Sequence, residues 1–295
     1  MRATSRPLFL AGAIAIAGSA GDKPPPYGAV RAQVGDEPPP HDAVWAQASS
    51  VAPTGDRHSP QPPPHDVQAL LGQVDEEWKR RDEPGHLDEA RALLAKAEET
   101  APDDYGVLWR LAQLHFWVSD DPTLSGEERT RLGKKAWEYG DRASAVNPRG
   151  VEGWYFAAVG MGNYSLGIGI LKALGQGVEG KFKQRLSMAE SISPNFYAGG
   201  IFNAWGRFYF KLPWPKYDAR KSERLLQKAI QVNPVNVRGR VFLAELYEKE
   251  GRIKDARDLL EQAITRQPGS LGSYDVPEER RSQKRARELL AELKR

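Results

Sequence analysis

Apolar residues recur at helical spacing from about residue 67 to the end of the chain, and no stretch predicts a strand. Several prolines have an apolar or small residue eight, five and two positions before them, a spacing that forms one stripe on a helix. Because a helix rarely continues past a proline, each proline also marks a helix end. The pattern predicts helices over 67–82, 86–100, 105–118, 126–146, 151–166, 178–192, 195–211, 218–232, 237–250, 252–266 and 277–294.

An alanine stands five residues before a proline at five places in this region. The five prolines are 46, 46, 40 and 34 residues apart, and intervals of this size are typical of stacked helical hairpins. Each alanine is expected where two helices approach closely, because a larger side chain would push them apart. The predicted packing alanines are Ala97, Ala143, Ala189, Ala229 and Ala263.

The last of these intervals is similar to a known repeat. It resembles a tetratricopeptide repeat, although Arg240 stands where tryptophan is usual and Ala244 replaces a glycine. The resemblance implies an all-α fold in which TPR-like antiparallel helical hairpins stack as an α-solenoid. The matching residues, in order, are Leu243, Ala244, Tyr247, Gly251, Ala256, Leu260, Ala263 and Pro268.

The chain divides into three segments on composition. Residues 1–20 resemble a secretory signal peptide, with Arg2 and Arg6 before an apolar stretch that ends in small residues. Residues 21–66 contain three Pro-Pro-Pro runs and few large apolar residues, so they predict a disordered proline-rich linker. Residues 67–295 form the predicted TPR-like domain, with the charged helix 277–294 as its terminal cap.

The signal predicts a secreted or periplasmic protein with a Sec-type leader. The apolar stretch is shorter than the roughly 20 residues of a membrane span, so no span is expected after cleavage, and an uncleaved anchor is the alternative. No cysteine follows the signal, so the leader is not that of a lipoprotein. The linker is either a spacer or a short motif that a partner binds through Val44 and Trp45.

Composition argues against several classes of function. The chain has no cysteine, which excludes disulfides and thiolate chemistry, and its net charge of +3 over 295 residues does not suggest a nucleic-acid surface. His86 and His115 are the only histidines of the predicted domain, and no nucleophile–base arrangement stands out. We therefore expect a non-enzymatic protein without a cofactor or a metal site.

Two segments in the middle of the chain differ from ordinary repeat sequence. Residues 160–180 are rich in glycine, which lets helices pack closely or lets a backbone approach a ligand. Residues 196–217 hold nine of the 27 aromatic residues, more than one core stripe requires. Aromatic rings with a polar edge often anchor ligands and partners, and nearby cations complement anions. The candidate binding residues are Tyr197, Trp205, Arg207, Tyr209, Lys211, Trp214 and Lys216.

The signal peptide, the helical hairpins and the loop from Leu212 to Pro215 are together similar to the TRAP-transporter T-component family. That resemblance implies a periplasmic protein without enzymatic activity that associates with a solute-binding subunit, self-assembles into a homo-oligomer and has an apolar pocket. Two functions follow as hypotheses. One is an exported scaffold for protein–protein interaction, and the other is a TRAP-associated small-ligand-binding component whose pocket lies among the glycine-rich and aromatic helices.

Overall fold

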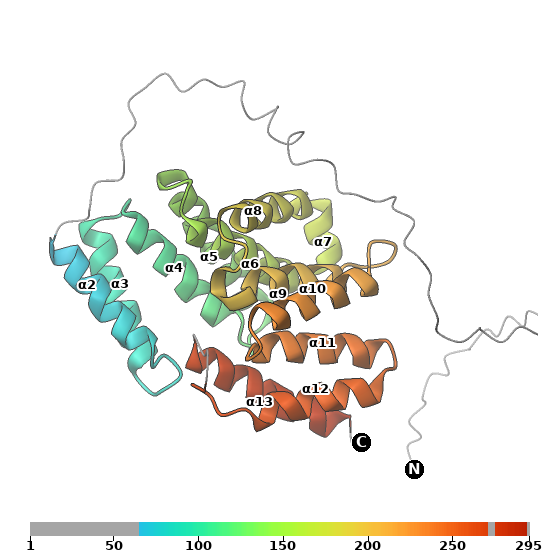
Figure 1. The fold of residues 1–295 in the computed structure, drawn as a ribbon. Helices are drawn as coiled ribbons and strands as arrows, with labels where there is room; N and C mark the ends of the chain where they lie inside the picture. Colours follow the sequence, from blue (N-terminus) through green and yellow to red (C-terminus); the bar gives the residue numbers. More distant parts are fainter. Residues whose placement is uncertain (1–64, 271–274, 294–295) are drawn as a thin grey trace, which may run out of the picture. The chain divides into compact units, whose positions relative to one another are not determined.

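The computed structural model describes residues 65–270 and 275–293 of the chain. The described residues form twelve α-helices and no strand (Figure 1). The predicted signal peptide and nearly all of the predicted linker lie outside the described residues. The helices are α2 (His65–Trp78), α3 (His86–Thr100), α4 (Tyr105–Ser119), α5 (Gly126–Val146), α6 (Val151–Ile168), α7 (Ile170–Gly175), α8 (Val178–Ile192), α9 (Phe196–Lys211), α10 (Ala219–Val232), α11 (Val237–Lys249), α12 (Ile253–Thr265) and α13 (Val276–Glu292).

Successive helices pack as antiparallel pairs, so the prediction of an all-α, TPR-like solenoid is confirmed. Three apolar clusters follow one another along the stack. The first lies among α2, α3 and α4, the second among α4 to α9, and the third among α10 to α13. Each hairpin buries its apolar face against its neighbours, which is how a repeat too small to hold its own core becomes stable.

The five packing alanines are all completely buried. Four of them also accept the hydrogen bond that closes their helix, because the backbone N–H four residues later donates to the alanine carbonyl at 2.9–3.1 Å. The following residue is the proline, which keeps the closing residue out of helical geometry and ends the helix. The four closing residues are Ala101, Asn147, Ser193 and Asn233.

Glycines bring α5 and α6 unusually close together. Each helix carries one glycine every seventh residue, a spacing that keeps them on one face. A Cβ atom added at Gly140 would lie 2.5 Å from the backbone nitrogen of Ala157, and one added at Gly160 would lie 2.6 Å from that of Trp137. The backbones therefore touch directly. These glycines are Gly126, Gly133, Gly140, Gly153, Gly160 and Gly167.

The start of α9 departs from helical geometry. Tyr197, Ala198 and Gly199 have φ angles of 54°, 48° and 89°, so regular helix resumes only at the next residue. The carbonyl of Ala198 accepts a hydrogen bond from the side chain of Asn236 on α11, at 3.3 Å. Two non-glycine residues in this conformation are strained, and contacts with other helices hold them there.

The terminal helix α13 packs on α11 and α12, and charged side chains also join it to the N-terminal part of the solenoid. Arg81, which follows α2, binds both carboxylate oxygens of Asp275 at 2.5 and 2.6 Å, and both side chains are buried. On the surface nearby, Arg280 pairs with Asp82 at 3.0 Å. Arg281 lies over the ring of Trp117 on α4, 3.2 Å from its centroid. These contacts close the stack at one side.

Candidate functional site

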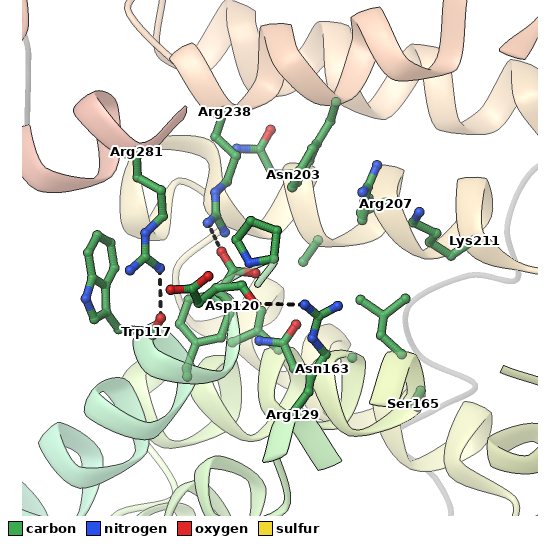
Figure 2. Close-up of a pocket in the computed structure, with 18 of the residues that line it drawn as sticks. Trp117, Asp120, Arg129, Asn163, Ser165, Asn203, Arg207, Lys211, Arg238 and Arg281 are labelled. Carbon is green, nitrogen blue, oxygen red and sulfur yellow. Dashed lines mark hydrogen bonds and ion pairs between the residues drawn. The ribbon is translucent and has the colours of Figure 1, made fainter. Parts of the chain in front are cut away.

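A cavity of about 1000 Å³ lies between α6–α9 on one side and α11 and α13 on the other (Figure 2). The ends of α4 and α5 contribute Trp117 and Arg129 to its lining. Its volume is that of a site for a small organic molecule. Because the contacts of α13 with α4 and with Arg81 border the same cavity, the closed form of the solenoid is what encloses it.

One side of the cavity, which we name the apolar wall, comes from the helices that carry the glycine-rich and aromatic sequence. Phe182 and Phe208 stack in this wall with their ring centroids 4.8 Å apart. Several neighbours keep part of their apolar surface exposed, and Leu166 is 36% exposed. The main side chains of the apolar wall are Leu166, Ile170, Leu174, Phe182, Phe208 and Leu212.

The charged residues of the cavity lining are unevenly paired. Five arginines form ion pairs, but four cations have no carboxylate within 4.0 Å among the described residues. Of the lining carboxylates in the described ranges, Asp121 alone lacks an ion pair. The lining therefore carries more cations than carboxylates, and part of its positive charge forms no close ion pair among the described residues. The four cations are Arg129, Lys211, Arg281 and Lys284.

Two of these arginines donate to backbone carbonyls instead. Arg129 donates from Nη2 to the carbonyl of Asp121 at 2.8 Å, and its buried Nε has no hydrogen-bond partner in the described part of the chain. Arg281 donates from Nη1 to the carbonyl of Trp117 at 2.7 Å. Burial lowers the pKa of Arg281 from its ordinary value. Both guanidinium groups thus retain donors that no carboxylate satisfies (Figure 2).

Lys211 is half-buried at the end of α9, beside the apolar wall. Burial, with a smaller contribution from the positive charges of Arg207, Lys249 and Arg285 and against the opposing effect of Glu245, lowers the pKa of its ammonium group to about 8. Its ammonium lies 5.0 Å from the ring centroid of Phe210. An anion placed in the cavity beside Lys211 would offset this unfavourable environment.

The structure brings only part of the predicted binding set to the cavity. Arg207 and Lys211 line it, and Arg207 also pairs with Glu245. Trp205 lies in the core, where its indole N–H donates to Glu190 at 2.8 Å. Tyr209 stacks on Trp205 at a centroid distance of 6.2 Å. These two rings therefore support α9 rather than line the cavity.

The other three predicted residues lie elsewhere. Tyr197 donates its hydroxyl to Asp275 at 2.8 Å and so belongs to the closing contacts of α13. Trp214 projects from the loop between α9 and α10 and is 89% exposed. Lys216, in the same loop, pairs with Glu179 at the start of α8. This pair joins the loop to α8, and on the preceding helix, α7, Leu171 is 74% exposed.

The arginines and lysines that complete the cavity were not part of the predicted set. Arg129 lies on α5, and Arg281 and Lys284 lie on α13, more than 150 residues further along the chain. The basic sequence of α13 was visible, but acidic residues are interleaved with it. Which cations of α13 line the cavity depends on how the helix is placed against it, and the sequence does not show that placement.

The contacts of His86 and His115 are with neighbouring side chains of the fold. Burial, together with the nearby charges of Lys135, Arg91 and Arg131, lowers the pKa of His115 to about 4. Its ring stacks on Tyr139 at 5.5 Å. His86 makes a 2.5 Å contact from Nδ1 to Glu77. In the described residues, no three His, Asp or Glu side chains form a group suited to a metal ion, and no helix has the length and apolarity of a membrane span.

Comparisons with known proteins agree with the fold. The family described as "Regulator of microtubule dynamics protein 1-3" matches residues 70–214, just under half of the chain, and a tetratricopeptide repeat family matches residues 217–274. No curated protein matches the chain. The repeat match falls on the segment whose sequence most resembles a tetratricopeptide repeat.

Among solved structures, a thermophilic TPR protein of Thermus thermophilus matches with a TM-score of 0.56 and 21% identity, over 75% of this chain and 98% of that one. PilF of Pseudomonas aeruginosa matches with a TM-score of 0.46 and 18% identity, over 77% and 91%. The repeat match and the first of these structures support a tetratricopeptide-repeat protein with a solenoid fold. The resemblance to the TRAP T-component family is not among these matches and stays a prediction.

Proposed function

We propose that this protein is a non-enzymatic scaffold of the cell envelope that binds a partner protein. TPR repeats suggest protein–protein interaction, and the repeat fold is typically non-catalytic. The observation that carries the proposal is the exposure of Trp214, a large aromatic side chain on a loop attached to the folded stack. Exposed tryptophans are frequent at the centres of protein interfaces, where they contribute more binding energy than other residues.

Leu171 supports the same location for the partner. It is the other large apolar side chain of the described residues that is more than half exposed, and it lies on α7. The Lys216–Glu179 pair joins the loop of Trp214 to the helix that follows α7. We name Trp214 and Leu171 together the partner face. Apolar side chains left in water at one end of a domain are typical of an interaction surface.

The test is capture of a partner by the purified full-length protein from the envelope fraction of its source. The variants Trp214→Ser and Leu171→Ser should each reduce capture at least tenfold, with thermal stability unchanged. Ile253→Ser is the matched control, since Ile253 is 39% exposed on the distant helix α12. Equal capture by all three variants would place the partner elsewhere. Sedimentation of the same proteins shows whether the partner is a second copy of the chain.

The location in the envelope rests on the sequence of residues 1–20, with a basic start, an apolar stretch and small residues. We propose export by the Sec route and cleavage near residue 20. N-terminal sequencing of the protein recovered from its source measures the cleavage directly. A mature chain that keeps Met1 and fractionates with the cytoplasm would contradict export, whereas the same chain in the membrane would indicate an uncleaved anchor.

The cavity favours a second candidate function, binding of a small ligand by a component associated with a TRAP-type transporter. The cavity lies where the glycine-rich and aromatic helices meet, and its lining holds cations that form no ion pair with a carboxylate of the described residues. These features are typical of a binding site. Association with a solute-binding subunit would appear in the same capture experiment as a transport protein bound at the partner face.

A further inference from the structure

We propose that the cavity binds a fatty-acid anion, with the aliphatic chain on the apolar wall and the carboxylate beside Lys211. The inference rests on the second candidate function, small-ligand binding, and names the class of ligand. It comes from the separation, within one cavity, of apolar side chains from cations that form no close ion pair.

Part of the apolar wall faces the cavity instead of packing against other side chains of the described residues. Its side chains come from four consecutive helices, and the short helix α7 adds Ile170 and Leu174 to the wall. A ligand chain lying on this surface would remove it from water, which is the main driving force for binding an aliphatic molecule. The wall carries no cation of its own except Lys211 at its edge, so the ligand is apolar along most of its length.

Two lysines of the cavity lining form no close ion pair among the described residues. Lys211 lies at the end of the wall (Figure 2), and Lys284, which also lines the cavity, is exposed on α13. Neither forms an ion pair among the described residues, and Arg129 keeps a buried Nε donor free of any partner there. A half-buried cation without a counter-ion is unfavourable, and an anionic ligand would relieve it. The lowered pKa of Lys211 agrees with a site that favours negative charge.

The closure of the solenoid limits the ligand to a small molecule. Arg81–Asp275 and Arg280–Asp82 join the N-terminal hairpin to the terminal helix, and Arg238 pairs with Asp120 on the same side. An extended peptide running along the whole groove would have to pass these contacts. A cavity of about 1000 Å³ instead accommodates a single aliphatic chain.

The experiment is calorimetric titration of the full-length protein at pH 7 with dodecanoate below its micelle concentration. Dodecanol has the same chain without the charge, and acetate has the charge without the chain. Dodecanoate should bind saturably at one site per chain, and both dodecanol and acetate should bind at least tenfold more weakly. Titration with an acidic peptide tests the competing class of ligand.

Two variants test the two halves of the site, each with a matched control. Lys211→Met keeps the length of the side chain and should weaken dodecanoate binding about tenfold, the effect of losing one charge-assisted contact. Lys254→Met, on an exposed part of α12, should change nothing. Leu166→Asp places a negative charge on the apolar wall and should weaken binding at least tenfold. Leu171→Asp, outside the cavity, should not.

Each result decides for or against the inference. If dodecanol binds as well as dodecanoate, the cavity binds small ligands but the inference of an anion is wrong, and the second candidate function stands. If the acidic peptide binds and dodecanoate does not, the ligand class is wrong and the site serves a protein partner. If no probe binds to a protein with native circular dichroism and thermal stability, both the inference and the second candidate function fail. The capture experiment on the partner face is unaffected by any of these outcomes.

Discussion

The backbone contact between α5 and α6 makes a strong prediction, because two glycines of α6 stand in opposite environments. A Cβ atom at Gly160 would lie 2.6 Å from the nitrogen of Trp137 and 2.8 Å from the Cβ of Ala136. At Gly162, two residues further, the nearest atom would be Cε2 of Phe182 at 4.0 Å. Both glycines lie inside the same helix, so Ala at either position gains the same helix propensity, about 1 kcal/mol.

The two variants should therefore change stability in opposite directions. Gly162→Ala keeps the propensity gain and should stabilise by about 0.5–1 kcal/mol. Gly160→Ala must separate two backbones by about 1 Å to reach van der Waals contact, and no side chain can rotate away. Overpacking of this kind costs about 3 kcal/mol at the upper end of its range, which leaves a net loss of about 2 kcal/mol.

Urea unfolding measures both free energies, and a thermal scan should place the two melting temperatures roughly 6–12 °C apart. The m-values should match that of the original protein, which shows that the same structure unfolds. If Gly160→Ala proved as stable as Gly162→Ala, α5 and α6 would not pack backbone to backbone. If both variants lost stability equally, the loss would come from an effect on the whole of α6 and not from the contact at Gly160.

Two further predictions concern buried charge. The folded-state pKa of His115 is about 4, below its ordinary 6.5, so the unfolded chain binds the proton more readily than the folded one. The protein should therefore lose at most about 3 kcal/mol of stability as the pH falls from 6.5 to about 4, and none above pH 6.5. His115→Phe should remove that part of the pH dependence in urea unfolding, and an unchanged profile would contradict it. Asp275→Ala leaves Arg81 buried without its carboxylate and should destabilise the protein by about 3–5 kcal/mol. Arg280→Ala breaks the exposed pair with Asp82 and should cost only about 0–1 kcal/mol. Equal losses in urea unfolding would refute the difference between the buried and the exposed pair.

The sequence predicted the helices and their order well, because the relevant signals are local. A proline ends a helix through its own ring and the residue before it, so the Ala–Pro spacing located four helix ends that the backbone hydrogen bonds reproduce. The predicted helix over 67–82 is shorter in the structure, where α2 ends at Trp78 and a turn leads to α3. The seven-residue spacing of glycines in α5 and α6 was also present in the sequence and would have predicted their close contact.

The residues of the candidate site were harder to predict from the sequence. Trp205 and Trp214 lie nine residues apart in one aromatic segment, and composition treats them alike. Trp205 is buried because its helix turns it toward α8, whereas Trp214 lies beyond the helix end and is exposed. Which aromatic residues pack and which remain free depends on the neighbours of each helix, and those neighbours are not adjacent in sequence.

The sequence by itself determined that this chain forms stacked helical hairpins, where the helices end, and which small residues lie between them. Tertiary structure alone decided that α13 reaches the N-terminal hairpin, that a cavity is enclosed there, and that Arg129, Lys211, Arg281 and Lys284 share it. The reason is physical. Helix ends and stripes arise from interactions within a few residues, whereas a cavity and its charge arise from the curvature that accumulates along the whole stack and brings distant helices face to face.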